Sequence, residues 1–267
     1  MSRIGGPMNR YSAWARECLL FVQSHIVGFI GVAIMLEACI AVGHSLVSTF
    51  ADHAGARVGL VDGMLMLVDP PAGLLSLPQV ILGPLAILVI LVQTQHDHAY
   101  NAEVRLGSAG LWAKKAFVAC VVAVGVSFLY FVLLTVSSLE RYAIFAESGG
   151  SSSLLHLFTG LLEFPFPSLL VAFCVTGVHC LVVVLFEVAL FLLLYRITKN
   201  GFLGFASVVV LSMVALILLN FPSAFGSGYY FFATDDHRDL ILVVGFSALV
   251  LGVPQIIYSS KRSRHDS

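Results

Sequence analysis

Long apolar stretches without charged residues constrain this chain more than any other feature of its sequence. Residues 116–136 contain no charged side chain, and several further stretches along the chain have the same character. An apolar helix of about 20 residues crosses the hydrocarbon core of a bilayer. Only 11% of the residues are charged and the mean hydropathy is +0.97, whereas soluble domains contain about 25% charged residues. The sequence therefore predicts an all-α integral membrane protein, with residues 1–267 forming a single transmembrane domain.

The lengths of these stretches predict six transmembrane helices. Residues 8–22 place aromatic side chains on one side at helical spacing, a pattern typical of an interfacial helix. The apolar run from Cys18 to Phe50 is longer than one straight span needs, so we expect a bend near Gln23 and Ser24, before the first span. The six expected spans cover about residues 25–47, 77–93, 116–136, 169–195, 202–219 and 240–258.

The segments between the spans are expected to be mostly loops. Residues 51–78 and 137–167 carry charges, prolines and glycines, which favour loops with at most short helical pieces, one of them dipping into the membrane at 154–162. Asn220 to Phe232 is apolar but short and interrupted by proline and glycine, which favours a re-entrant or interfacial hairpin before the last span. Pro84 is expected to kink the second span.

The basic residues predict the orientation. Six spans place both termini on one side of the membrane, and 11 of the 14 lysines and arginines fall on that side. Because basic residues are retained on the cytoplasmic side, the sequence predicts a multi-pass protein of the plasma membrane with both termini in the cytoplasm.

The sequence contains none of several common catalytic motifs. There is no GxxxxGK[ST] phosphate loop, no GxSxG and no HExxH, so we expect neither nucleotide hydrolysis nor other catalysis by this chain. The five cysteines lie in or beside apolar segments without a CxxC pair, which favours buried apolar side chains over metal or redox chemistry. Consecutive His96, Asp97 and His98 point about 100° apart on a helix and do not converge on a metal. No cofactor and no nucleic acid partner is expected.

Three ionisable residues lie inside expected spans. Glu37 is near the middle of the first span, His44 lies two turns later on roughly the same face, and Glu187 is in the fourth span. An ionisable group at membrane depth costs about 2.5 to 3.5 kcal/mol on insertion scales, so such residues normally face the protein interior or a wet cavity. The sequence leaves two roles open for them: hydrogen bonding within the bundle, or a place on a transport path.

One polar interval separates two expected spans on the cytoplasmic side. It runs from Gln95 to Lys115 and leads directly into the third span. Trp112 is expected to anchor it at the membrane surface, with Lys114 and Lys115 at the lipid headgroups. We interpret this interval as a membrane-surface loop that contacts another protein; the alternative is a basic loop that serves only to orient the chain.

The string EVRLGSAGLWAKKAF within this interval resembles a known element. It is similar to the cytoplasmic loop between the second and third helices in the six-helix permease subunits of ATP-binding-cassette exporters of the type-two class. An arginine followed by Gly-Ser and a Trp-Lys pattern is common there; the matching residues here are Arg105, Gly107, Ser108, Trp112 and Lys114. The interfacial helix, the six spans and the broken segment before the last span agree with that architecture.

The resemblance implies a function. This chain would be the permease subunit of an ATP-driven exporter, working as a homo- or heterodimer of permeases in the lipid bilayer with two separate ATPase subunits that hold ATP and magnesium. Glu103 and Arg105 would be the exposed contacts to the ATPase. An amphipathic, lipid-like, peptide or antibiotic cargo would leave through an interface formed by the first, second and fifth spans.

Two other functions remain open from the sequence alone. The alternative is a gradient-driven secondary transporter or channel that uses Glu37 and Glu187 as proton or cation sites. A membrane sensor or assembly protein whose external loops bind a ligand is the third possibility.

Overall fold

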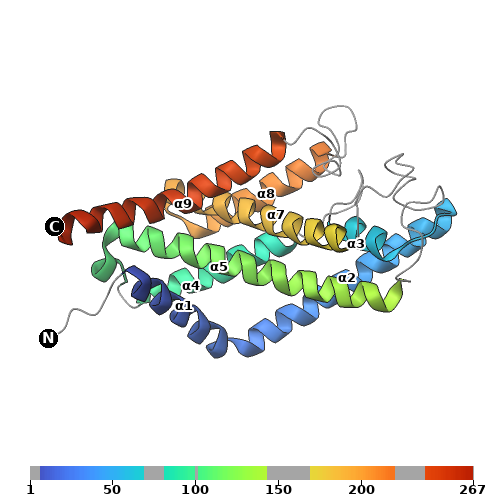
Figure 1. The fold of residues 1–267 in the computed structure, drawn as a ribbon, viewed down its shortest axis with the longest axis horizontal. Helices are drawn as coiled ribbons and strands as arrows, with labels where there is room; N and C mark the ends of the chain where they lie inside the picture. The colour runs from blue at the N-terminus through green and yellow to red at the C-terminus, as the bar shows by residue number, and fades with distance from the viewer. Residues whose placement is uncertain (1–6, 69–80, 100–101, 143–168, 220–237, 267) are drawn as a thin grey trace.

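The structure is a bundle of helices (Figure 1). The computed structural model describes residues 7–68, 81–99, 102–142, 169–219 and 238–266. All elements in these ranges are helices, as predicted: α1 (Pro7–Ser24), α2 (Ile26–Ala54), α3 (Leu60–Val68), α4 (Gly83–Ala99), α5 (Ala102–Arg141), α7 (Leu169–Thr198), α8 (Gly201–Leu219) and α9 (Arg238–Asp266).

Three of these helices are long and apolar enough to cross a membrane. Their apolar parts are Ile26–Ala54 in α2, Gly107–Arg141 in α5 and Thr176–Thr198 in α7. Within the described residues, α4, α8 and α9 contain shorter apolar stretches, at Gly83–Thr94, Gly201–Leu211 and Val244–Ile257. Each of the six expected spans thus overlaps an apolar helix, three of them long enough to cross a membrane, and these helices indicate a membrane-embedded protein of the all-α class.

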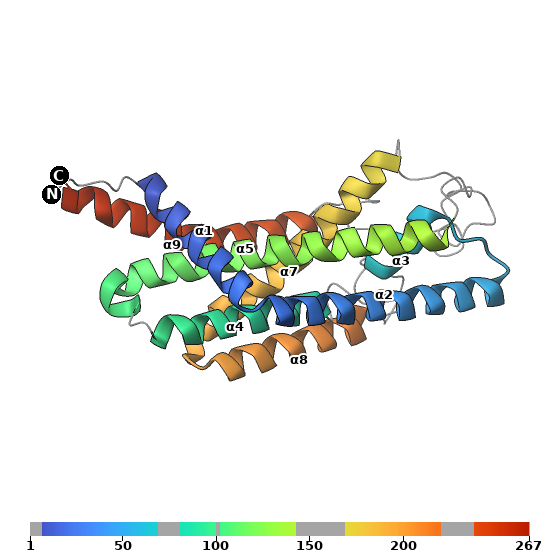
Figure 2. The same cartoon turned by 90° about the horizontal axis from the view of Figure 1, so that it is seen from below.

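The break between α1 and α2 confirms the bend expected near Gln23 and Ser24. His25 has non-helical backbone angles (φ −117°, ψ 21°), and the Ser24 hydroxyl donates to the Phe21 carbonyl at 2.9 Å. The two helices meet at an open angle, with α1 leaning across the bundle toward α5 and α9 (Figure 2).

Helices α5 and α7 form the centre of the bundle. Both pack against α9 and α4, α5 also packs against α2, and α7 also packs against α8. Seen from below, α9 lies on one side of the central pair, whereas α2, α4 and α8 lie on the other (Figure 2). The start of α1, the turn from α4 to α5, the turn from α7 to α8 and the end of α9 all lie at one end of the bundle (Figure 1). This end carries Lys114, Lys115, Arg196 and Lys199, and we call it the basic end.

Helix α5 extends beyond the expected third span on its N-terminal side. The expected span covers residues 116–136, and α5 begins at Ala102, inside the polar interval. Gly107 interrupts it with φ 66° and ψ 170°, a conformation that glycine adopts without a steric penalty. Within the described residues, the polar interval therefore comprises the end of α4, a helical turn over residues 102–106, a bend at Gly107, and the first turns of a long helix.

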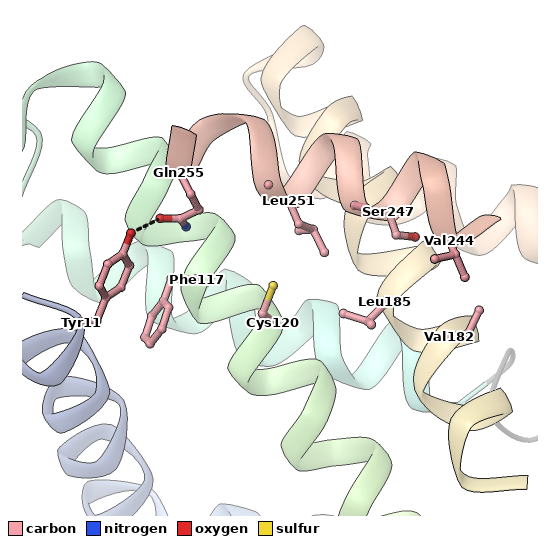
Figure 3. A pocket seen from close by; sticks show the side chains of 11 residues that line it. Tyr11, Phe117, Cys120, Val182, Leu185, Val244, Ser247, Leu251 and Gln255 are labelled. Carbon is pink, nitrogen blue, oxygen red and sulfur yellow. Dashed lines mark hydrogen bonds between the residues drawn. The ribbon is translucent and has the colours of Figure 1, made fainter. Parts of the chain in front are cut away.

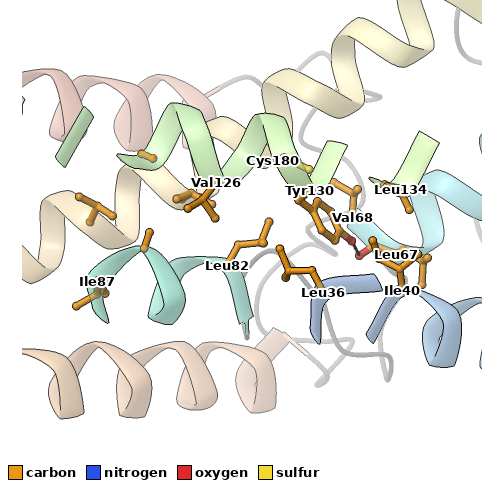
Figure 4. Packing of buried hydrophobic residues seen from close by; sticks show 14 of the residues in the cluster. Leu36, Ile40, Leu67, Val68, Leu82, Ile87, Val126, Tyr130, Leu134 and Cys180 are labelled. Atoms are coloured by element: carbon orange, nitrogen blue, oxygen red, sulfur yellow. Dashed lines mark hydrogen bonds between the residues drawn. The ribbon is translucent and has the colours of Figure 1, made fainter. Parts of the chain in front are cut away.

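The apolar core lies between α2, α3, α4, α5 and α7 (Figure 4). Leu36 and Ile40 of α2, Leu82 beside α4, and Tyr130 of α5 are fully buried there. The Tyr130 hydroxyl donates to the Leu67 carbonyl of α3 at 3.4 Å. Helix α3 is the short helical piece expected within residues 51–78. It packs against α2, α5 and α7 and lies away from the basic end (Figure 1).

Two prolines lie within the helices, Pro84 in α4 and Pro254 in α9. Ile81 and Leu82 form a π-helical turn immediately before Pro84, where the sequence predicts a kink. Pro254 lies inside α9, and the sequence analysis made no prediction for this proline. The expected re-entrant segment at 220–232 and the dipping helix at 154–162 lie outside the described residues.

Candidate functional site

An ion pair ties α1 to the start of α5 at the basic end. The Lys114 ammonium nitrogen lies 2.6 Å from a Glu17 carboxylate oxygen; the lysine side chain is buried and that of Glu17 is 52% exposed. Trp14, on the same side of α1, is 5% exposed, and its ring centroid lies 5.8 Å from that of Phe117 of α5. The apolar side of α1 is therefore packed on α5, and the Glu17 carboxylate of α1 is paired with a lysine of α5.

A second cationic side chain is held by aromatic rings. The Lys115 nitrogen lies 4.6 Å from the centroid of the Tyr195 ring and 5.3 Å from that of Trp112, and it donates to the Tyr195 hydroxyl at 3.4 Å. The Arg196 guanidinium lies 5.7 Å from the Trp112 centroid. Cation–π contacts of this kind stabilise a partly desolvated charge. They also join the second and third turns of the long part of α5 to the last turn of α7.

Gln255 of α9 connects three helices. Its amide nitrogen donates to the Ala113 carbonyl of α5 at 2.6 Å, and its amide oxygen accepts a hydrogen bond from the Tyr11 hydroxyl of α1 at 3.2 Å. Gln255 follows Pro254 in α9. Its side chain reaches the backbone carbonyl of Ala113 in a contact between helices that is otherwise apolar.

An apolar pocket of about 730 Å³ begins at this glutamine and runs between α1, α5, α7 and α9 (Figure 3). Its lining comes from four helices and contains no charged residue: Tyr11, Phe117, Cys120, Val182, Leu185, Val244, Ser247, Ala248, Leu251, Gly252 and Gln255. The volume lies within the range of about 300 to 1,000 Å³ common for small-molecule sites.

The residues named from the resemblance are only partly brought together. Glu103 and Arg105 lie in the helical turn before Gly107, but their side chains are outside the described residues. Gly107 and Ser108 are exposed at the bend. Trp112 and Lys114 point into contacts within the chain, with α7 and α1 respectively. Lys114 and Lys115 are each 5% exposed, so the expectation that both sit at lipid headgroups is wrong.

The intramembrane candidates do not form one cluster. His44 is fully buried, and its ring nitrogens lie 3.0 Å from the Tyr142 hydroxyl and 3.3 Å from the Ser138 hydroxyl. Glu37 is half-buried on the same side of α2, because seven residues return to within about 20° of the same face. The polar partners of His44 come from the end of α5, opposite the basic end (Figure 1).

Glu187 packs against the start of α4. Its side chain is 3% exposed, and a Cβ atom at Gly83 would overlap its carboxyl group. The absence of a side chain at Gly83 thus makes the space that the carboxyl group occupies.

A further buried carboxyl group lies in α3, outside the apolar spans. Asp62 is fully buried, and its Oδ2 accepts a hydrogen bond from the Gly59 backbone N–H at 3.1 Å. Burial raises the pKa of Asp62 to about 6, and the Gly59 hydrogen bond opposes this rise. Sequence reasoning assigned Asp62 only to a loop; its position three residues after Gly59, at the start of an apolar helix, is the signal of a helix cap.

Gln255 and the pocket were also missed. A single glutamine in an apolar segment was the available signal, because a polar side chain at such a position normally has a partner on another helix.

Comparisons with known proteins identify no relative. A scan against models of protein families, a search of curated proteins and a search of solved structures each returned no match. Within the described part of the chain, no group of three or more His, Cys, Asp and Glu residues is placed to hold a metal ion. The site must therefore be interpreted from its own geometry.

Proposed function

We propose that this chain is the permease subunit of an ATP-driven ABC exporter. The observation that carries the proposal is the geometry at the basic end. A short helical turn at 102–106 precedes a glycine bend, and two helical turns after the bend α5 is tied to α1 by the Glu17–Lys114 pair. A protein without its own motor needs a rigid projecting element that a partner can push. A short helix joined to a central helix of the bundle has that property.

The proposed mechanism follows the contacts of α5. Closure of the two partner ATPases, which hold ATP and magnesium, pushes the 102–106 turn through Glu103 and Arg105. Because Lys114 binds α1 and Trp112 contacts Tyr195 of α7, motion of this segment is transmitted to both helices at once. The bend at Gly107 sets the angle at which the turn meets the bundle.

The same proposal includes a six-span topology in the plasma membrane. The six helices α2, α4, α5, α7, α8 and α9 would cross the bilayer, with the basic end and both termini in the cytoplasm. The positions of the lysines and arginines support this orientation. The re-entrant segment before α9 belongs to the proposal as an element of the family resembled.

The exposed face of α2 supports a second permease as partner. Only 17% of its most apolar window is buried, against 39% in α5 and 44% in α7. A homodimer or heterodimer would cover part of that face, with an amphipathic, lipid-like, peptide or antibiotic cargo leaving between α2, α4 and α8 and their counterparts in the second permease.

Co-purification tests this proposal. The tagged chain would be isolated in mild detergent, its partners identified by mass spectrometry, and ATP hydrolysis measured. We expect a stoichiometric ATPase that is lost on combining Glu103→Lys with Arg105→Glu. Arg57→Glu, a charge reversal at an exposed site before α3, should retain the ATPase. A chain that purifies without a nucleotide-hydrolysing partner would contradict the proposal.

Glu187 supports a second candidate, a gradient-driven transporter. A carboxyl group that is 3% exposed within an apolar helix is a candidate proton or cation site. This function predicts that the purified chain alone, in vesicles, moves its substrate under a proton or cation gradient. Substitution of Glu37→Gln or Glu187→Gln should abolish the coupling. If the chain alone transports nothing under either gradient, this candidate fails.

A further inference from the structure

The pocket between α1, α5, α7 and α9 lies apart from the proposed cargo route. That route involves α2, α4 and α8, whereas the pocket borders on α9, on the other side of the central helices (Figure 2). Its walls have been assigned no role so far. The pocket can therefore be considered as a site in its own right, whatever partner the chain has.

The dimensions of the pocket match one leaflet of a bilayer. Its lining residues on α9 extend from Val244 to Gln255, eleven residues apart, which corresponds to about 16 Å along a helix. Half of the hydrocarbon core of a bilayer is about 15 Å thick. The pocket thus has the length of a lipid chain in the leaflet at the basic end. Tyr11 (36% exposed) and Val244 (44% exposed) lie on its rim, so a chain can enter sideways from the bilayer.

The chemistry of the pocket specifies the head of that lipid. The lining contains no ionisable acid or base apart from the tyrosine and the cysteine, so a charged head would find no counter-charge among the residues that line the pocket. Besides Ser247, the hydroxyl and amide groups of the lining are those of Tyr11 and Gln255, which meet at one end of the pocket (Figure 3). Gln255 uses one of its two amide hydrogens on the Ala113 carbonyl and one oxygen lone pair on Tyr11. One donor and one acceptor position remain.

We propose that this pocket binds a single-chain lipid, or one chain of a larger lipid, whose head is uncharged and hydrogen-bonding, such as a monoacylglycerol. The chain lies along Phe117, Leu185 and Leu251, and the hydroxyl or ester group meets Gln255. Because Gln255 joins α1, α5 and α9, the bound lipid fixes the position of α1. This inference goes beyond the proposed export function and does not require an ATPase partner.

Photo-crosslinking tests the proposal on the chain alone. The purified full-length protein would be reconstituted in phosphatidylcholine vesicles with a trace of monoacylglycerol that carries a diazirine on its acyl chain. After irradiation, the crosslinked peptides would be identified by mass spectrometry. We expect crosslinks to α5 and α9 residues that line the pocket.

Two glycines of α9 provide a matched pair of variants. Gly252 lines the pocket and Gly245 does not, and a Cβ atom at either position meets nothing within 4 Å. Gly252→Phe should fill the pocket and reduce crosslinking by about fivefold or more, whereas Gly245→Phe should leave it unchanged. Equal crosslinking in both variants would overturn the proposal.

The head group is tested with a second probe. A fatty acid with the same diazirine chain, ionised at pH 8, should crosslink at least about fivefold less than the monoacylglycerol. Gln255→Leu should remove that difference. A fatty acid that crosslinks as well as the monoacylglycerol would overturn the assignment of an uncharged head.

Cys120 gives an independent measurement that needs no bulky substitution. Its thiol projects from α5 toward α9 in the pocket (Figure 3). In a chain that keeps Cys120 and has alanine at the other four cysteines, monooleoylglycerol should slow alkylation by N-ethylmaleimide about fivefold or more. A chain that keeps only Cys174, an exposed residue of α7 outside the pocket lining, should show no such protection. Equal rates at Cys120 with and without the lipid would contradict the proposal.

Discussion

The Lys114 ammonium group of α5 lies 2.6 Å from the Glu17 carboxylate of α1. It is the only ion pair between Lys or Arg and Asp or Glu found within the described residues, and it follows the Gly107 bend by two helical turns. The position of α1 on the bundle therefore depends on this charged contact together with the packing of Trp14 and the Tyr11–Gln255 hydrogen bond. This relationship is open to a double-mutant test.

Charge reversal at this pair should be compensated by exchange of the two charges. Glu17→Lys alone places two cations side by side, and the buried lysine loses its counter-charge. We expect a loss of about 1 to 3 kcal/mol, between the values for exposed and buried pairs. Glu17→Lys combined with Lys114→Glu should recover at least half of it. The measurement is the midpoint of thermal denaturation in detergent, converted to free energy for the four members of the cycle.

Arg16→Glu is the control for the change in net charge on α1. Arg16 is exposed beside Glu17, so this reversal should change the midpoint little. A midpoint in the exchanged double variant no higher than in the worse single variant would show that the ion pair does not hold α1.

Gly107 should not tolerate a side chain. Its φ of 66° combined with ψ of 170° is disfavoured for residues with a Cβ atom, at a cost of about 1 to 3 kcal/mol. Gly107→Ala should therefore straighten or destabilise the bend and lower the recovery of the partner ATPase in co-purification. Gly125→Ala, also in α5 and with open space at its Cβ position, should be neutral or stabilising. A Gly107→Ala chain that retains both stability and partner would contradict this assignment.

The Tyr142 hydroxyl should contribute to stability through His44. Tyr142→Phe keeps the ring that packs against Gly63 but removes the hydrogen-bond partner of the His44 Nδ1 atom. A buried polar group left without a partner costs about 1 to 3 kcal/mol, which should appear as a lower denaturation midpoint. Tyr11→Phe, which removes a hydrogen bond from a more exposed tyrosine, is the control and should cost less. Equal effects of the two changes would argue against the His44 contact.

Sequence periodicity and hydropathy predicted the fold at the level of its elements. The bend after α1 and the helical character of all six apolar stretches follow from the chain itself, because a span of fixed length and a continuous apolar run leave few alternatives. The expectation that two adjacent lysines lie at the lipid headgroups was wrong. In the structure Glu17 neutralises Lys114, and two aromatic rings take up the charge of Lys115. Such compensation depends on residues that are distant along the chain.

The candidate site was harder to predict for the same reason. Gln255, Ala113 and Tyr11 belong to three separate helices, and no spacing within one helix signals that they meet. His44 was identified as an intramembrane polar residue, but its partners Ser138 and Tyr142 are about ninety residues away. Local pattern identifies which polar groups need a partner, and only tertiary packing identifies the partner.

Asp62 should make stability depend on pH. Burial raises its folded-state pKa from the ordinary 3.8 to about 6, so the folded chain binds the proton more tightly than the unfolded chain. Its contribution to stability is full below about pH 3.8 and falls as pH rises to about 6, by about 3 kcal/mol at most. Asp62→Asn should flatten this part of the stability profile, because the amide oxygen can still accept from the Gly59 N–H while carrying no charge. The measurement is the denaturation midpoint in detergent between pH 4 and 7, with Asp52→Asn at an exposed site of α2 as the control. A profile unchanged by Asp62→Asn would show that another group is responsible.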